Sequence, residues 1–199
     1  MINERQDQKD AVYANMAREI ARLSKDENTQ LGAIIVAKDG TPISWGYNGT
    51  VSGFDDLLVP HSREVKTLQY AIIEDDTSEV NIHIFESNKY PFMAHAESNA
   101  IFYGDKAKLA GSTIYVTGFP CENCALQIAR AKIARVVVTD TSNDANSTVN
   151  KNNNNSMFIF AQHNIHLTMG GKHYTLACDL LPRIKPRDSN AYCTAGAST

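Results

Sequence analysis

The pattern of hydrophobic and polar positions predicts a helix followed by a β hairpin in the first quarter of the chain. Between residues 6 and 24, apolar residues recur at steps of three and four, which predicts one buried helix face carrying Val12, Met16, Ala17, Ile20 and Leu23. Residues 31–36 are apolar and β-branched, and the turn formers "AKDG" separate them from residues 42–47. These two runs predict a hairpin.

The second half of the chain alternates between strand and helix patterns. Strands are expected in "STIYVTGF", "ARVVVTDT" and "IHLTMG", and helices in "HAESNAIFYGDK", "CENCALQIARAKI" and "SMFIFAQHN". A strand, helix, strand order indicates parallel pairing through a crossover. We therefore expect an α/β fold, a three-layer α/β/α domain with a mixed sheet of about five strands and helices on both faces.

The 199 residues predict a single domain over residues 1–180. Residues 57–88 have no sustained period, and we expect an insertion packed at the edge of the domain. The Asn-rich stretch at about 142–156 is expected to be a polar loop, and residues 181–199 a weakly ordered tail.

Charge and composition argue against several classes of protein. The net charge of −3 disfavours binding to a polynucleotide or to an anionic membrane surface. No apolar run approaches the roughly 18–20 residues of a membrane helix, and the charged N-terminus does not resemble a signal peptide. We expect a cytoplasmic protein whose four cysteines stay reduced.

Two short motifs carry the candidate chemistry. His95 and Glu97 form an H-x-E motif. A gap of 23 residues, the last of which is Pro120, separates it from the C-x-x-C pair Cys121 and Cys124. The combination H-x-E…P-C-x-x-C is typical of zinc-dependent nucleobase deaminases.

The residue types suit a catalytic zinc ion. Cys121 and Cys124, near the first turn of a helix, can both face one ion as thiolates, and His95 supplies a third ligand. Three protein ligands leave the fourth tetrahedral position open, as in catalytic zinc sites. Glu97 then lies close enough to move protons between water and a substrate without binding the metal.

Two other interpretations of the cysteines stay open from the residues alone. A C-x-x-C pair in a cytosolic protein is often a redox dithiol, although the usual Trp-Cys-Gly-Pro-Cys context is missing. A structural zinc site would need a fourth ligand, for which Cys178, Cys193 or His163 could be proposed. We expect these three, with His61, His83, His166 and His173, to be ordinary thiols and surface or core histidines.

Beyond the zinc motif, "NTQLGAIIV", "GYNGTVSGFDD", "KYPFMAHAESNAI", "STIYVTGFPCENCA" and "RVVV" follow one another in the order found in deoxycytidylate (dCMP) deaminases. The chain resembles this family over roughly residues 10–140, apart from the insertion. The resemblance implies one zinc held by His95, Cys121 and Cys124, with Glu97 as the catalytic proton shuttle.

The resemblance also implies roles in substrate binding. Asn48 would hydrogen-bond the sugar hydroxyl, although Asn48 before Gly49 could instead serve a left-handed turn. The backbone amide of Ala96 would meet the pyrimidine carbonyl.

The activity implied by the resemblance is hydrolytic deamination of dCMP to dUMP and ammonia, which supplies dUMP for thymidylate synthesis. A bifunctional dCMP/dCTP deaminase, another cytidine-type deaminase and a nucleotide-binding pseudo-deaminase stay open as alternatives. The resemblance further implies regulation by dCTP and dTTP, Mg²⁺ with an allosteric nucleotide, a homohexamer, and the host cytoplasm if the protein is phage-encoded. The allosteric residues are unknown; Asp55 and Asp56 could assist a metal–nucleotide, but adjacent acids are more often a solvated loop.

Overall fold

The computed structural model describes residues 4–55, 57–73, 79–139 and 153–176. Its main sheet contains β1 (Gly32–Val36), β2 (Pro42–Tyr47), β7 (Thr113–Val116), β8 (Arg135–Val138), β9 (His166–Met169) and β10 (Lys172–Tyr174). The helices are α1 (Glu4–Ala21), α2 (Ala96–Tyr103), α3 (Lys106–Leu109), α4 (Glu122–Arg130) and α5 (Asn154–Gln162), with a short 3₁₀ helix η1 (Tyr90–Phe92). None of these helices has the length and hydropathy needed to cross a membrane.

The six strands lie in the order β10-β9-β8-β7-β1-β2. Strands β7, β8 and β9 are parallel, while β1 pairs antiparallel with β2 and β7, and β10 antiparallel with β9. The expected parallel pairing around α4 and the mixed sheet are thus confirmed, with one strand more than expected. The extra strand, β10, is only three residues long and exposed, so its sequence has no hydrophobic run that would have predicted it.

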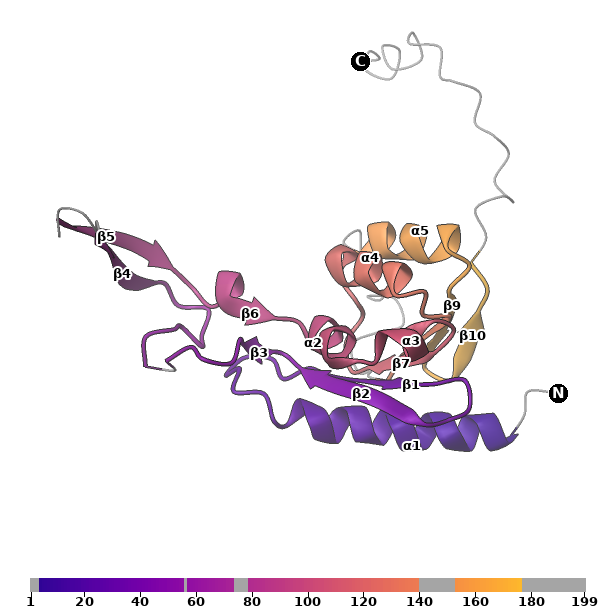
Figure 1. Cartoon of the computed structure of the whole chain (residues 1–199). Helices are drawn as coiled ribbons and strands as arrows, with labels where there is room; N and C mark the ends of the chain where they lie inside the picture. Colours follow the sequence, from indigo (N-terminus) through magenta and orange to yellow (C-terminus); the bar gives the residue numbers. More distant parts are fainter. Residues whose placement is uncertain (1–3, 56, 74–78, 140–152, 177–199) are drawn as a thin grey trace, which may run out of the picture.

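Helices cover both faces of the sheet (Figure 1). On one face α1 packs through Ala17 against Ile34, Val36 and Tyr115. On the other face lies a larger core between the sheet and helices α2, α4 and α5, with Phe160 at its centre. All five residues of β1 are buried because both sides of this strand are covered. The three-layer α/β/α prediction is confirmed.

The buried face of α1 differs from the expected one. Ala17 is fully buried, but Val12 is 57% exposed, and Met16 and Leu23 are exposed as well. The helix turns Tyr13 toward the sheet instead, where the Tyr13 hydroxyl donates a hydrogen bond to the carbonyl of Gly40 at 2.6 Å. Ile20 packs beside Ala17 as predicted, and Tyr13, an aromatic side chain with a polar tip, takes the place expected for Val12 and Met16.

The insertion also differs from the expectation. Residues 66–73 and 80–87 form a β hairpin of β4 (Lys66–Ile73) and β5 (Val80–Ser87), which extends away from the domain (Figure 1). The expected packing against the domain edge is wrong for this hairpin. Both of its faces are exposed, so neither strand has one buried side that would have produced an alternating pattern.

Two other expected segments lie mostly outside the described residues. The end of the Asn-rich stretch is helical, since α5 begins at Asn154. The remainder of that stretch and the whole expected tail are not described. The single-domain boundary at residue 180 stays a prediction.

Candidate metal centre

The start of α2 brings His95 to the site. His95 is the N-cap residue of this helix and has an extended backbone. It follows directly after β6 (Met93–Ala94), which pairs with β3 (Gly49–Thr50) in a two-residue ladder. This ladder places Asn48, just before β3, and His95, just after β6, at the same end of one small sheet.

The start of α4 supplies the two cysteines. β7 ends at Val116, and a four-residue loop leads to Cys121, the N-cap residue of α4. Cys124 lies in the first turn of that helix and is almost completely buried. Both thiols therefore lie at the carboxyl edge of the parallel strands, as expected for α/β sheets.

The three side chains converge on one point. The Nδ1 atom of His95 lies 3.3 Å from the Sγ atom of Cys124 and 3.5 Å from that of Cys121. All three donor atoms lie within 4.8 Å of one another. Bond lengths of roughly 2.0–2.3 Å around a tetrahedral zinc ion would separate such donors by about 3.3–3.8 Å. The donor set and its spacing therefore fit a zinc ion.

The hydrogen bonds among these donors shift their titration. Hydrogen bonds from Cys124 and His95 lower the pKa of Cys121 to about 3. The hydrogen bond to Cys121 raises the pKa of Cys124, and burial adds to this rise. The pKa of His95 is also raised, chiefly by its hydrogen bond with Cys121. The donors share protons that a divalent cation would displace on binding.

Glu97 lies beside the donor cluster in the first turn of α2, and its side chain is buried. Burial raises the pKa of its carboxyl group, although hydrogen bonds from its own backbone N–H and from Cys124 act in the opposite direction. A buried carboxyl with a raised pKa can both accept and donate a proton near neutral pH. Glu97 is therefore suited to proton transfer at this site.

Ala96 is the first residue of α2 and is buried. Its N–H is one of the groups that the helix itself leaves without an acceptor. Asn48 is 7% exposed, and its Oδ1 accepts a hydrogen bond from the N–H of Leu31 at 2.7 Å. Its Nδ2 donates to the carbonyl of Thr29 and to Asp26.

The backbone at Asn48 excludes one explanation of this residue. Neither Asn48 nor Gly49 has a positive φ, so the left-handed turn considered for Asn48 is wrong. Substrate contact by Asn48 and by Ala96 stays a prediction.

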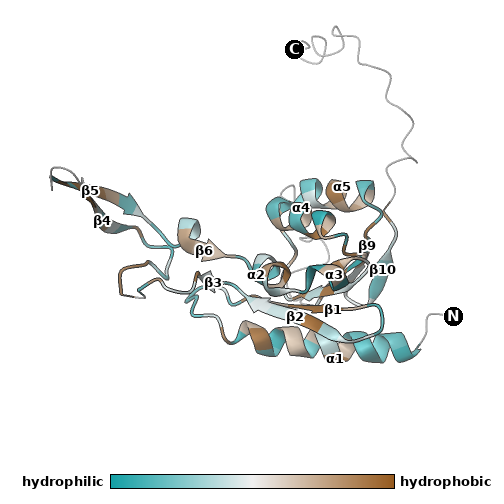
Figure 2. Cartoon of the chain, viewed as in Figure 1, coloured by the Kyte–Doolittle hydropathy of each residue, from teal (hydrophilic) through white to brown (hydrophobic). Residues whose placement is uncertain are grey.

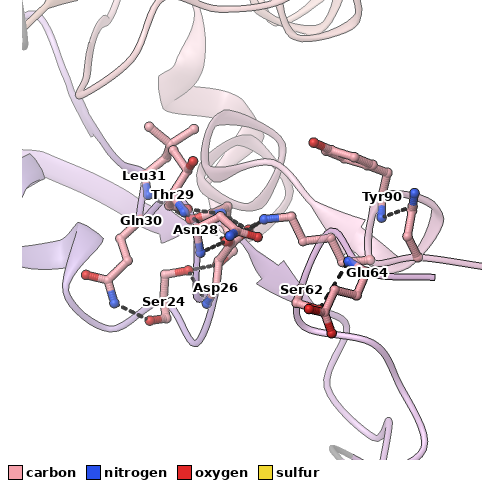
Figure 3. Close-up of polar contacts among 12 residues, drawn as sticks. Ser24, Asp26, Asn28, Thr29, Gln30, Leu31, Ser62, Glu64 and Tyr90 are labelled. Carbon is pink, nitrogen blue, oxygen red and sulfur yellow. Dashed lines mark hydrogen bonds and ion pairs between the residues drawn. The ribbon is translucent and has the colours of Figure 1, made fainter. Parts of the chain in front are cut away.

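A buried ion pair between Asp26 and Lys89 contacts Asn48, because Asp26 accepts a hydrogen bond from Nδ2 of Asn48. Figure 3 shows Asp26 and the hydrogen bonds around it. The Nζ atom of Lys89 lies 2.5 and 2.6 Å from the two carboxylate oxygens of Asp26, and both side chains are 4% exposed. The Asp26 carboxylate also accepts hydrogen bonds from the N–H groups of Asn28 and Thr29. Burial alone would raise the pKa of Asp26, but these hydrogen bonds outweigh it and lower the pKa.

This pair was not predicted from the sequence. Asp26 stood among turn formers, and Lys89 lies 63 residues further along the chain. A signal was present: Lys89 begins "KYPF", the stretch that carries the family resemblance just before His95. The pair connects the loop after α1, which contains Asp26 and contacts Asn48, to the segment from Lys89 that leads to His95.

The other candidate residues lie apart from the centre or outside the description. Oδ1 of Asp55 accepts a hydrogen bond from the N–H of Leu57, which closes a local turn. Asp56, Cys178 and Cys193 are not among the described residues. Within the described part of the chain, the group of potential metal ligands is His95, Cys121 and Cys124. It contains none of the histidines at 61, 83, 163, 166 and 173.

Comparison with known proteins identifies the family. The model of the cytidine and deoxycytidylate deaminase zinc-binding region matches residues 7–140, which is more than half of the chain. The chain therefore belongs to this family of zinc-binding deaminases.

Curated relatives include several deoxycytidylate deaminases. The chain is 35% identical over 129 residues to the deoxycytidylate deaminase of Mus musculus, covering 64% of this chain and 63% of the mouse protein. It is 33% identical over 129 residues to that of Mycobacterium phage D29, covering 64% of this chain and 91% of the phage protein. The match to the mouse protein thus spans less than two thirds of that protein's length.

A solved structure shares the fold. The dCMP deaminase of cyanophage S-TIM5, in complex with dCMP and dUMP, superposes with a TM-score of 0.55 at 23% identity, covering 85% of this chain and 98% of that one. At this identity the similarity confirms the deaminase fold.

Proposed function

We propose that the protein catalyses hydrolytic deamination of dCMP to dUMP and ammonia. The observation that carries this proposal is the convergence of His95, Cys121 and Cys124 beside the buried Glu97. The relatives described as deoxycytidylate deaminases support dCMP as the substrate.

In this proposal one zinc ion per chain is held by His95, Cys121 and Cys124. When bound, zinc lowers the pKa of a water molecule toward neutrality and polarises the substrate. Three protein ligands would leave the fourth tetrahedral position of the ion for that water.

Glu97 accepts the water proton and delivers it to N3 of the cytosine ring, which makes C4 more electrophilic. The remaining hydroxide adds to C4. Glu97 then accepts the proton of the new C4 hydroxyl group and gives it to the amino group, which leaves as ammonia while the C4 carbonyl of uracil forms. The N–H of Ala96 holds the pyrimidine carbonyl. Oδ1 of Asn48, which keeps a second lone pair beside its bond from Leu31, accepts a hydrogen bond from the sugar hydroxyl.

The same proposal includes features that rest on family resemblance. These are regulation by dCTP and dTTP, Mg²⁺ bound with an allosteric nucleotide, assembly into a homohexamer, and a role in supplying dUMP for thymidylate synthesis in the cytoplasm.

A substrate panel tests the proposal. Zinc-loaded protein is incubated with dCMP, dCTP, deoxycytidine and cytidine, each with and without dCTP or dTTP as effector, and uracil formation and ammonia release are measured. We expect dCMP to be the preferred substrate. Preference for dCTP or a nucleoside would indicate one of the other deaminases, and nucleotide binding without turnover would indicate a pseudo-deaminase.

A further inference from the structure

The orientation of the Asn48 carboxamide is fixed by its hydrogen-bond partners. Its Oδ1 accepts a hydrogen bond from the N–H of Leu31 at 2.7 Å, so the oxygen must face that group. Its Nδ2 donates to the carbonyl of Thr29 at 2.9 Å and to the Asp26 carboxylate at 3.3 Å, and neither of these partners can donate in return. Exchanging the two ends of the amide would therefore break all three hydrogen bonds in a buried place, which is costly.

Lys89 keeps Asp26 in the state that this arrangement needs. An ionised carboxylate only accepts hydrogen bonds, whereas a protonated one could donate to Asn48. The Nζ atom of Lys89 lies 2.5 and 2.6 Å from the two oxygens of Asp26, and an adjacent positive charge favours the ionised form. The N–H groups of Asn28 and Thr29 both donate to Oδ1 of Asp26. The other oxygen, Oδ2, is the one that accepts from Asn48.

The loop between α1 and β1 also holds the backbone of Asn48. Residues 24–30 have hydrophilic colour in Figure 2, yet Ser24 and Asp26 are buried. The hydroxyl of Ser24 donates to the carbonyl of Asn48 at 2.7 Å, and the side chain of Gln30 donates to the carbonyl of Ser24 at 2.7 Å. The loop therefore fixes both the position and the orientation of a single side chain, that of Asn48.

Asn48 lies next to the candidate metal centre. It precedes β3 at the end of the β3–β6 ladder where His95 follows β6. Nδ2 of Asn99 in α2 donates to the carbonyl of Tyr47 at 2.8 Å, which ties the residue before Asn48 to the helix that His95 caps. Both Nδ2 hydrogens of Asn48 are used within the protein, and Oδ1 keeps one lone pair. Asn48 can therefore offer a ligand at this centre an acceptor but no donor.

We propose that Asp26 and Lys89 are positioning residues that present Asn48 to the substrate as a hydrogen-bond acceptor only. The site then selects nucleotides whose sugar carries a free hydroxyl group, which can donate. It rejects nucleotides in which that oxygen is absent or esterified, as it is inside a polynucleotide strand. In dCMP the one free sugar hydroxyl is at C3′. The inference rests on the proposed contact between Asn48 and the sugar of dCMP, and it adds the selection and the residues that impose it.

The test compares nucleotides that differ at C3′ of the sugar. dCMP and its 3′-amino analogue can donate a hydrogen bond, whereas the 3′-fluoro analogue has a substituent of similar size that cannot. Zinc-loaded wild-type protein should deaminate the first two. Its kcat/KM for the 3′-fluoro analogue should be about 10–100-fold lower than for dCMP, because the buried acceptor is left unpaired. The ratio of the two kcat/KM values cancels differences in the amount of folded protein.

Asp26→Asn/Lys89→Met removes both charges without leaving one unpaired, and it turns an amide NH₂ toward Nδ2 of Asn48. The ratio should fall to about 3-fold or less, mainly through lost activity on dCMP, as it should in Asn48→Ala. Asp26→Asn alone, which hardly changes the volume, should act in the same direction. The matched control is Asp10→Asn/Arg135→Met, which removes a largely buried ion pair away from the site and should keep the wild-type ratio. Circular dichroism and zinc content check that each variant is folded.

A wild type that does not distinguish dCMP from the 3′-fluoro analogue would overturn the inference. So would a wild-type ratio in the Asp26 variants, or a ratio lost equally in the control. Calorimetric binding of the same nucleotides to the Glu97→Gln protein measures the selection without turnover. Selection in binding without any deamination by the wild type would contradict the proposed reaction and support the inference, whereas deamination without selection would contradict the inference alone.

Discussion

The ion pair of Asp26 and Lys89 is almost fully shielded from water, yet the two residues come from loops. Burying two charges costs nearly as much as their attraction returns, so such a pair adds little net stability. Removing one partner, however, leaves an unpaired buried charge. Here the unpaired charge of Asp26 would lie in contact with Asn48, whose Nδ2 donates a hydrogen bond to Asp26.

We therefore expect Lys89→Met to lower the free energy of unfolding by about 3–5 kcal/mol. Adding Asp26→Asn should recover part of this loss, because the unpaired charge disappears while the amide oxygen still accepts from Asn28 and Thr29. Urea unfolding of the single and double variants measures both effects. Arg22→Met, which breaks an exposed pair with Glu19, is the control and should change little.

Glu97 and Glu122 are matched carboxyl groups in the first turns of the two site helices. Glu97→Gln should reduce turnover of dCMP by about 10²–10⁴-fold, since the amide cannot transfer protons. Zinc content should be unchanged because Glu97 is not a ligand. Glu122→Gln should leave turnover nearly intact. Loss of zinc from Glu97→Gln, measured by atomic absorption, would contradict the proposed role.

Asp10 provides a pH-dependent contribution to stability away from the site. Burial would raise its pKa, but hydrogen bonds from Arg135, Tyr115 and Gln6 together outweigh burial and lower the pKa. A carboxyl with a lowered folded-state pKa stabilises the fold above its unfolded pKa of about 3.9, and this stabilisation is lost as pH falls through the folded value.

Asp10→Asn should accordingly lower the Tm near pH 7. The difference from wild type should shrink as pH falls below about 4, because wild-type Asp10 then becomes protonated too. Thermal unfolding of both proteins from pH 7 to pH 3 measures the difference, and the effect of acid on the metal ligands cancels. A difference that stays constant with pH would show that the charge of Asp10 is unimportant.

At the scale of elements, two glycines permit close approach of helices to the sheet. A Cβ atom on Gly46 of β2 would lie 2.4 Å from the carbonyl oxygen of Ala96 and 2.5 Å from the nitrogen of Ala100, both in α2. A Cβ atom on Gly32 of β1 would lie 2.2 Å from the carbonyl oxygen of Ala17 in α1. These are backbone atoms, so the helix itself must move.

Both Gly46→Ala and Gly32→Ala should lower stability, but only Gly46→Ala should weaken zinc binding. It displaces α2, whose start carries His95 and Glu97, whereas α1 carries no residue of the site. Competition with a metal-binding dye gives the zinc affinity, and thermal unfolding gives the stability. Gly49→Ala, where a Cβ atom meets only ordinary contacts at 3.6 Å or more, is the control. Equal loss of zinc affinity in the Gly32 and Gly46 variants would contradict this explanation.

The elements with one or two covered faces could be predicted from the sequence. β1 is a continuous apolar run because helices cover both of its sides, and α4 has a clear apolar stripe ending in buried Ile128 and Ala129. The hairpin β4–β5 could not be predicted in this way, since burial imposes no alternation on a hairpin exposed on both faces. The buried face of α1 was misplaced because Tyr13, rather than Val12 or Met16, packs against the sheet.

Some residues of the candidate site could likewise be predicted from the sequence, and others could not. His95, Cys121 and Cys124 could be predicted because metal ligation demands these residue types at short spacings, and the structure brings them together. The contacts of Asn48 and the Asp26–Lys89 pair could not, because they depend on how distant loops meet in space. Polar residues in loops give no periodic signal of such a meeting.

At the scale of the whole molecule, metal binding should be coupled to folding. The three ligands come from the starts of two separate helices, and zinc that binds only the folded chain stabilises it by mass action. We expect a chelator to lower the Tm and added zinc to restore it, with a shift that grows with zinc concentration. His95→Ala should abolish the zinc-dependent part of the Tm. A wild-type Tm that does not change with zinc concentration would argue against a metal site in the folded state.

The short ladder between β3 and β6 has a consequence for the evolution of this chain. By pairing Thr50 with Met93, the ladder joins the two chain segments that flank the 57–88 insertion. The insertion can therefore change in length or sequence, and each doubling of its length adds only about 0.6 kcal/mol of loop-closure free energy. Natural selection could therefore rework this appendage repeatedly while the candidate metal centre, which begins at His95 two residues after Met93, kept its geometry.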